Sequence, residues 1–256
     1  MSVAQTTRRG EVSIRDLSKS FAINGRSLHV LKGLSLDVEP GECVVIVGAS
    51  GSGKTTLLRL VSGLEQADAG RVLIDGAPVT GVGAERAMIF QEPRLLPWLT
   101  VLGNVAFGLE VRGAPRAEAE ERARGYISLV GLYDFTDAYP RQLSGGMAQR
   151  VGIARALTVQ PEILLLDEPL GALDAMTKIT MQEELALIWR EQNVTMIVVT
   201  HDLEEAVYLA DRVLILPKDK GGKPRLIDID LPRPRDRSDT RFVRLREELL
   251  REFGLH

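Results

Sequence analysis

The sequence contains a single cysteine, Cys43, among 256 residues, which excludes a fold held together by internal disulfides. Cys43 lies within an apolar run, so we expect a small buried side chain there rather than a reactive thiol. No apolar run approaches the roughly 20 residues that are needed to cross a bilayer, so no membrane-spanning segment is predicted. This composition suits a reducing cytoplasm.

Strong charge of one sign is also missing. A net charge of −3 and a pI near 5.8 argue against a protein that coats nucleic acid, so no nucleic-acid partner is expected. Residues 1–10 carry two arginines but no apolar segment follows them, so no secretory signal is expected there. The length suits one α/β domain, or one domain that carries a sizeable insertion.

The most informative segment is residues 48–55, which read Gly-Ala-Ser-Gly-Ser-Gly-Lys-Thr. This segment follows the apolar strand-like run Cys43–Val47 and precedes a helix-like stretch, Thr56–Leu64. Glycines let the backbone turn its N–H groups toward phosphate, and the helix start adds partial positive charge. The spacing predicts a loop that binds a nucleoside triphosphate such as ATP through Gly48, Ala49, Ser50, Gly51, Ser52, Gly53, Lys54, Thr55 and Thr56.

Within this loop, Lys54 is expected to reach the β- and γ-phosphates and Thr55 to hold Mg²⁺. Two carboxylates, Asp167 and Glu168, follow a second apolar run, Ile163–Leu166. Ligands of α/β sheets bind at the carboxyl ends of strands, so Asp167 is predicted to hold Mg²⁺ and Glu168 to orient the attacking water. An acidic helix cap after a strand would give the same pattern, but the upstream loop favours catalysis.

A second candidate phosphate site is Ser144, Gly145 and Gly146, which precede a helical stretch. Backbone N–H groups at a helix start can face phosphate, although the same residues also form ordinary helix caps. The position of this segment between the glycine-rich loop and the acidic strand favours the phosphate interpretation.

Strand-like and helix-like runs alternate along the chain, with one interruption. The first runs predict a small antiparallel sheet: Val12–Asp16, Leu28–Leu31, Leu34–Val38 and Arg71–Ile74. Later apolar runs predict buried parallel strands: Ala87–Phe90, Ile163–Leu166, Thr195–Val199 and Arg212–Leu216. Between them lie predicted helices at Asn104–Val111, Pro115–Val130 and Gly146–Gln160. Residues 217–224 are predicted to form a polar turn, and Phe242–Phe253 a closing helix that ends at Gly254.

The ordered set of motifs resembles the ATP-binding-cassette (ABC) family of transporter ATPases, and the resemblance covers nearly the whole chain. It implies an α/β P-loop NTPase fold of ABC type, with a RecA-like core sheet, an N-terminal antiparallel β subdomain and an inserted α-helical subdomain. We therefore predict a single ABC ATPase domain over residues 1–256. Its nucleotide-binding core would comprise residues 11–90 and 161–235, its helical subdomain residues 91–160, and its closing helix residues 236–256.

The resemblance also implies a head-to-tail dimer of two copies, in which Ser144, Gly145 and Gly146 act on the ATP held by the other copy. Gln91 falls where the family contacts Mg²⁺, and His201 falls where its switch histidine contacts the γ-phosphate. Alone, Gln91 equally suits a surface amide, and His201 a polar residue that starts a helix. The catalytic set implied by the family is Lys54, Glu168 and His201.

Two further positions follow from the resemblance. Asp174, in Gly-Ala-Leu-Asp, matches the loop that crosses the dimer interface, and Phe21 matches the aromatic that stacks on adenine. A phenylalanine early in a strand is also a common core residue. Met147 departs from the family, whose usual residue at this fifth signature position is glutamine, so we expect hydrolysis to survive and nucleotide affinity to shift modestly.

Residues 90–101 and 231–237 resemble the ATPase subunits of bacterial nitrate, sulfonate and taurine importers. Such a subunit lies peripherally at the cytoplasmic face of the inner membrane, binds integral membrane permease subunits, and serves a periplasmic solute-binding protein indirectly. Leu95–Leu99 would dock a short permease helix, or form a locally buried loop. Export, lipid trafficking, and a soluble ABC ATPase acting on DNA or ribosomes are the alternatives, although the last usually carries a long coiled coil or two cassettes.

Overall fold

The computed structural model describes residues 9–23, 25–171, 173–217 and 222–253. Its central sheet has the strand order β10-β9-β3-β8-β7-β6 in the described residues, and β10 alone in it runs antiparallel to its neighbour. The strands are β3 (Cys43–Gly48), β6 (Arg86–Ile89), β7 (Ile163–Asp167), β8 (Thr195–Val199), β9 (Arg212–Leu216) and β10 (Arg225–Asp228). The predicted parallel strands are confirmed, whereas β10 was not predicted.

Strand β3 is buried on both faces, which explains its unbroken apolar sequence. Cys43, Val45 and Val47 pack in the core with helices α5 (Ala175–Gln192), α6 (Leu203–Leu209) and α7 (Thr240–Glu252). Val44 and Ile46 point to the opposite face, where they join the core under the second sheet. Burial raises the pKa of the Cys43 thiol, as expected for a cysteine that acts as a small apolar side chain.

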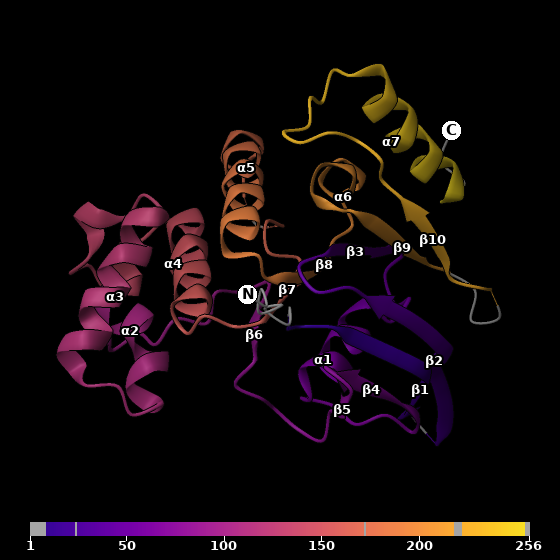
Figure 1. Cartoon of the computed structure of the whole chain (residues 1–256), viewed down its shortest axis with the longest axis horizontal. Coiled ribbons are helices and arrows are strands. Elements are labelled where there is room, and N and C mark those ends of the chain that lie inside the picture. The colour runs from indigo at the N-terminus through magenta and orange to yellow at the C-terminus, as the bar shows by residue number, and fades with distance from the viewer. Residues whose placement is uncertain (1–8, 24, 172, 218–221, 254–256) are drawn as a thin grey trace, which may run out of the picture.

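The second sheet is antiparallel with the order β2-β1-β4-β5 (Figure 1). Its strands are β1 (Val12–Ile23), β2 (Arg26–Val38), β4 (Ala69–Ile74) and β5 (Ala77–Pro78). The prediction of two separate strands at 28–31 and 34–38 was wrong, because both belong to β2. Gly33 has a φ of 62°, and the pairing of β1 with β2 shifts register nearby, so the strand bends there without ending.

Helix α1 (Lys54–Ser62) begins two residues earlier than predicted and also ends two residues earlier. Gly53, with a φ of 99°, caps its start, so the helix begins inside the glycine-rich loop. Gly63, with a φ of 77°, ends it in the left-handed conformation that glycine adopts at low cost. The two glycines therefore set both ends of the helix.

The helices between β6 and β7 form a separate group (Figure 1). They are α2 (Val101–Val111), α3 (Arg116–Leu129) and α4 (Gly145–Thr158), and they share their own apolar core. Their bounds differ from the predicted ones by up to three residues, because Thr100 and Ser144 cap α2 and α4 through their side chains. Pro115, the first residue of the predicted helix Pro115–Val130, is the N-cap residue of α3. Gly254 and residues 218–221 of the predicted turn lie outside the described residues.

Candidate functional site

The glycine-rich loop joins β3 to α1 at the carboxyl end of the central strand. Gly51 and Gly53 have positive φ values of 79° and 99°, so they turn the backbone in a way that other residues rarely adopt. A Cβ atom on Gly48 would lie 2.5 Å from Ser52 Oγ and 3.0 Å from the Leu216 carbonyl oxygen. The conformation of the loop therefore requires glycine at these positions.

Lys54 lies within this loop and only 7% of its surface is exposed. Its Nζ donates hydrogen bonds to the carbonyl oxygens of Gly48 at 2.8 Å and Ala49 at 3.2 Å. Burial lowers the pKa of Lys54, while the nearby carboxylates of Glu168 and Asp167 act in the opposite direction. The ammonium group is thus folded against the loop that is expected to hold the phosphates.

Thr55 and Asp167 meet across the gap between α1 and β7. The Thr55 hydroxyl donates to Asp167 Oδ1 at 3.0 Å. Burial raises the pKa of Asp167 above its usual value, and the Thr55 hydrogen bond partly opposes this shift. A hydroxyl and a carboxylate held together are oxygen donors of the kind that Mg²⁺ prefers.

Glu168 is the point where three strand ends converge. Its Oε2 accepts a hydrogen bond from Gln91 Nε2 at 3.4 Å and lies 3.2 Å from His201 Nδ1. Gln91 follows β6, Glu168 follows β7 and His201 follows β8. Glu168 has a φ of 47°, and its N–H donates to the Val199 carbonyl at 2.8 Å, which fixes the backbone at this turn. The structure brings the three predicted residues together.

A partly buried polar cluster forms around Asp202, the residue after His201, and was not predicted. Lys178 Nζ of α5 lies 2.6 Å from Asp202 Oδ2 and 3.8 Å from Glu205 Oε2. Glu205, 1% exposed, also accepts a hydrogen bond from the Thr200 hydroxyl at 2.8 Å. Burial raises the pKa of Glu205 to about 7. In the sequence, Glu205 resembles an ordinary acidic residue of a first helical turn, and no local pattern distinguishes it.

Ser144 and Asp174 lie in a different place from the glycine-rich loop. Ser144 Oγ accepts from Met147 N at 3.3 Å at the start of α4, and Asp174 Oδ1 accepts from Thr177 N at 3.0 Å at the start of α5. A Cβ atom on Gly146 would lie 3.2 Å from Leu173 Cδ2, so the two helix starts are neighbours. No hydrogen bond or ion pair among the described residues joins Ser144 or Asp174 to Lys54, Thr55 or Glu168.

Helix α4 is tied to the segment that contains Gln91. Gln149 Nε2 donates to the Phe90 carbonyl at 3.3 Å, and the Arg155 guanidinium donates to the carbonyls of Pro93 at 2.8 Å and Arg94 at 3.0 Å. Burial lowers the pKa of Arg155. The helix that starts at Ser144 is therefore connected through side chains to the segment next to Glu168, and sequence periodicity gave no sign of this connection.

Asn104 of α2 holds the following residues, 96–100, by hydrogen bonds to their backbone. Its amide donates to the carbonyls of Leu96, Leu99 and Thr100, and its Oδ1 accepts from Leu96 N at 2.8 Å. This fully buried side chain holds residues 96–100 in one conformation against α2. Met147, the unusual signature residue, is partly buried against the core of the same helical group.

Phe21 lies on β1 opposite Leu28 of β2 and is partly exposed, with Lys19 Nζ 5.2 Å from its ring centroid. Residues paired across neighbouring strands point to the same face of the sheet, so Phe21 and Leu28 share a face. Side chains alternate along a strand, so Val30, two positions after Leu28, lies on that face as well. A Cβ atom on Gly53 would lie 2.9 Å from Val30 Cγ1, so this face looks onto the glycine-rich loop. The placement is compatible with adenine stacking, which stays a prediction.

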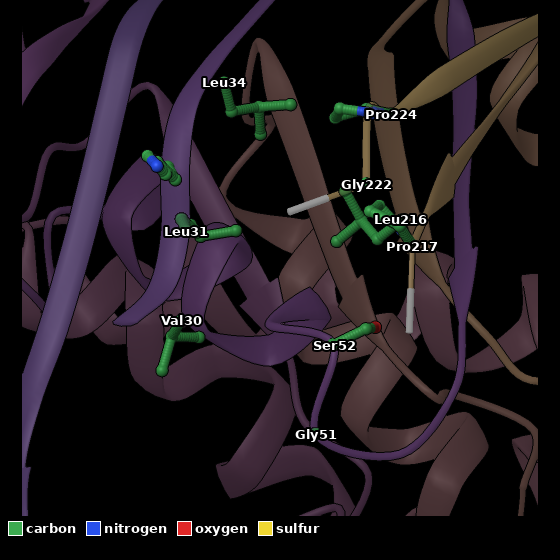
Figure 2. Close-up of a pocket in the computed structure, with 10 residues that line it drawn as sticks. Val30, Leu31, Leu34, Gly51, Ser52, Leu216, Pro217, Gly222 and Pro224 are labelled. Atoms are coloured by element: carbon green, nitrogen blue, oxygen red, sulfur yellow. The ribbon is translucent and has the colours of Figure 1, made fainter. Parts of the chain in front are cut away.

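A small cavity of about 40 Å³ opens beside the loop, between Gly51 and Ser52 on one side and Leu216, Pro217 and Pro224 on another (Figure 2). This volume holds roughly one water molecule, so the cavity is too small for a nucleotide. The phosphates are expected to lie instead on the loop itself and on the strand ends that carry Asp167 and Glu168.

Together, a buried lysine in a glycine loop, a hydroxyl–carboxylate pair and a carboxylate held between an amide and an imidazole define a P-loop nucleotide hydrolase. The sequence model of the family described as "ABC transporter" matches residues 31–171. This chain belongs to the ABC transporter family. As in that family, it binds and hydrolyses ATP.

Similar proteins match this chain over nearly its whole length. An uncharacterized ABC transporter ATP-binding protein of Methanocaldococcus jannaschii is 48% identical, over 94% of this chain and 90% of its own length. The nitrate import ATP-binding protein of Synechocystis is 46% identical, over 93% of this chain and 89% of its own length. The aliphatic sulfonates import ATP-binding protein of Bacillus licheniformis is 46% identical, over 94% of each chain.

Solved structures show the same fold. The dimeric structure of a bacterial ABC transporter cassette superposes with a TM-score of 0.78 at 31% identity, covering 86% of this chain and all of that one. A dimeric post-hydrolysis state of that cassette, bound to ADP and Pi, gives a TM-score of 0.77 at 32% identity, with the same coverage. In the described residues, no helix is both long enough and apolar enough to cross a membrane.

Proposed function

We propose that this chain is the ATP-hydrolysing subunit of a bacterial ABC importer for nitrate, an aliphatic sulfonate or taurine. The observation that carries this proposal is 46% identity, over more than nine tenths of the chain, to import subunits named for nitrate and for aliphatic sulfonates. The solute itself would not touch this chain, because the permease and the binding protein would carry it.

ATP would lie on residues 48–56 with Mg²⁺ held by Thr55, Asp167 and Gln91. The donor set fits this ion, since the Thr55 hydroxyl and the Asp167 carboxylate are in contact and both offer hard oxygen atoms. Gln91, whose amide contacts the adjacent Glu168, would offer a third. When bound, Mg²⁺ would neutralise charge on the β- and γ-phosphates. Lys54 would turn from the loop carbonyls to the same phosphates.

Glu168 would orient the attacking water, and His201 would contact the γ-phosphate. Both roles suit the contact between their side chains, which lie 3.2 Å apart, and the Glu168 charge acts on Lys54 of the glycine-rich loop. Phosphoryl transfer needs positioning and charge neutralisation more than covalent catalysis, so a held carboxylate, a lysine and a metal ion suffice. Phe21 would stack on the adenine.

The site would be completed by a second copy of the chain. Ser144, Gly145 and Gly146 begin α4 with free backbone N–H groups, yet they make no hydrogen bond to the glycine-rich loop of their own chain in the described residues. In a head-to-tail dimer they would face the γ-phosphate held by the other copy, and Asp174 would cross the interface. The dimeric cassette neighbours support this arrangement.

The permease would dock beside Gln91. Trp98 is 70% exposed. It lies in the segment 93–100, whose backbone carbonyls accept hydrogen bonds from Asn104 and Arg155. A rigid loop that presents an exposed indole suits the capture of a short permease helix. The chain would then lie peripherally at the cytoplasmic face of the inner membrane, where residues 91–160 would transmit the contact to the nucleotide.

The test is a pull-down of tagged Glu168→Gln chain with Mg-ATP in mild detergent from its native cells. We expect a multi-helix permease, identified by mass spectrometry, whose associated binding protein takes up nitrate, a sulfonate or taurine. The matched control carries Trp98→Asp as well, and it should lose the permease while it retains ATP. Recovery of ribosomes or DNA-repair proteins in place of a permease would refute the importer function.

A further inference from the structure

A cavity of about 370 Å³ is lined by residues of α5, of α6 and of the segment before α7, and it shares no lining residue with the glycine-rich loop. One wall is the second half of α5, and the other is the segment between β10 and α7, which Figure 1 shows passing the upper end of α5. At roughly 30 Å³ per water molecule, this volume accommodates about a dozen water-sized groups. The cavity is therefore large enough for a small organic molecule.

Part of the lining is apolar. Ala186 and Leu187 of α5 face Tyr208 of α6 and Pro234 across the cavity. Leu187 is 47% exposed, so part of its surface is available to a ligand. A ligand with a short aliphatic or aromatic body would bury this surface and gain the usual free energy of apolar contact.

The remaining lining is mostly cationic. Arg190, Arg233 and Arg235 line the cavity together with one carboxylate, Glu183. Glu183 lies 3.4 Å from Arg237, which already offsets part of its charge. Arg190 makes no ion pair with any residue that the structure describes. The balance of charge around the cavity is therefore positive.

Arg235 contributes a charge that forms no ion pair with a carboxylate among the described residues, although the charge of Asp211 acts on it from nearby. It is 7% exposed, and its guanidinium donates only to backbone carbonyls, those of Val207, Tyr208 and Ile229. Burial, together with the nearby charge of Arg233, lowers the pKa of Arg235 to about 10, so it stays protonated at neutral pH. The Val207 and Tyr208 carbonyls lie at the end of α6 and the Ile229 carbonyl follows β10; together they partly offset the charge, but an anion would offset it further.

Arg233 is held in place for a similar role. Its guanidinium stacks on the Trp189 ring at 4.4 Å and donates to Asp211 Oδ1 and the Leu209 carbonyl, both at 2.8 Å. An arginine that is fixed on three sides loses little further freedom when it binds an anion. The cavity thus combines two rigid arginines on one wall with a free one, Arg190, on the other.

We propose that this cavity is a binding site for a small organic anion, a sulfonate or carboxylate with a short apolar body. The anionic head would lie between Arg190 and the pair Arg233 and Arg235, and the body would contact Leu187 and Tyr208. The ligand would bridge α5, which begins at Asp174, and α6, which follows His201. This site is independent of the solute that the transporter carries.

The experiment is isothermal titration of 1-butanesulfonate into the full chain saturated with Mg-ADP, which fills the glycine-rich loop and prevents anion binding there. We expect saturable binding of one ligand per chain, weakened about tenfold by Arg190→Gln, because one of the charge contacts is lost. Arg190 is exposed, so the variant should keep its melting temperature. Arg251→Gln, an exposed arginine of α7, is the matched control and should bind like the wild type.

A second ligand tests the apolar wall. Nitrate, which has no apolar body, should bind about tenfold more weakly than 1-butanesulfonate, and Leu187→Asn should remove most of that difference. Absence of saturable binding to the Mg-ADP form would overturn the site. Binding that Arg190→Gln leaves unchanged, or equal affinity for the two anions, would also contradict it.

Discussion

The Nδ1 atom of His201 lies 3.2 Å from Oε2 of Glu168, and the same carboxylate oxygen accepts the amide of Gln91 at 3.4 Å. These contacts join the ends of three parallel strands at one carboxylate. Glu168 is 24% exposed, so it can reach water while its orientation is set by its neighbours. This geometry is what a residue that positions a water molecule requires.

Replacing Glu168 by Gln should abolish turnover and preserve ATP binding, because shape and hydrogen-bonding capacity remain while the negative charge is lost. We expect the ATPase rate to fall at least about 100-fold with nucleotide affinity within about threefold of the wild type. Steady-state ATPase assays and nucleotide titration measure the two quantities. Near-normal turnover would assign the water-positioning role to another residue.

Lys54→Ala should lose ATP binding, since the β- and γ-phosphates would be left without their lysine. We expect affinity for ATP to fall at least about 100-fold, measured by titration with a fluorescent ATP analogue. Lys32→Ala is the matched control, because Lys32 is an exposed lysine of the adjacent β2 that makes no phosphate contact in this account. Wild-type affinity in Lys54→Ala would contradict the assignment of the loop.

Glu205 should make the stability of the protein depend on pH. Its folded pKa of about 7 lies above the ordinary value of 4.5, so the folded state holds a proton that the unfolded state releases. The contribution of Glu205 is therefore fully present below about pH 4.5 and is lost as pH rises through about 7. Its size is up to about 3 kcal/mol of unfolding free energy.

Glu205→Gln removes this titration while an amide oxygen remains to accept from Thr200. The unfolding free energy of the variant relative to the wild type should rise by up to about 3 kcal/mol between pH 5 and pH 8. Urea unfolding of both proteins at several pH values measures the difference. A difference that stays constant over this range would show that Glu205 keeps an ordinary pKa.

Arg155→Met should uncouple the permease from hydrolysis, because the carbonyls of Pro93 and Arg94 lose their link to α4. We expect the ATPase rate of the isolated chain to stay within about twofold, while stimulation by the permease falls at least about fivefold. Arg122→Met, on the exposed side of α3, is the control. If Arg155→Met lowered the basal ATPase rate and the stimulation by the permease by the same factor, Arg155 would have a purely structural role.

Much of this architecture was predictable from the sequence, because buried parallel strands leave unbroken apolar runs and a phosphate loop needs glycines at fixed positions. Gln91 and His201 were implied by the resemblance to the ABC family, and each follows one of these runs, as Glu168 does. Boundaries were less predictable. Gly33 bends β2 within one continuous strand, and the short exposed strand β10 carries no distinctive pattern.

The polar clusters were not predictable, since they depend on contacts between distant segments. Lys178 and Glu205 are 27 positions apart on two helices, and each looks like a solvent-facing charge in its own helix. Asn104 and Arg155 lie on α2 and α4 and meet the same loop, again without any local signal. Such residues become visible only when the packing of the helices is known.

The central claim is that one chain supplies the glycine-rich loop and its copy supplies Ser144 to the same ATP. The most direct test mixes Lys54→Ala chains with Ser144→Arg chains, each inactive alone, and measures ATPase activity. The account predicts partial recovery, because a mixed dimer has one interface in which an intact loop faces an intact Ser144. No recovery in a mixture whose dimers are shown to form would contradict the shared site.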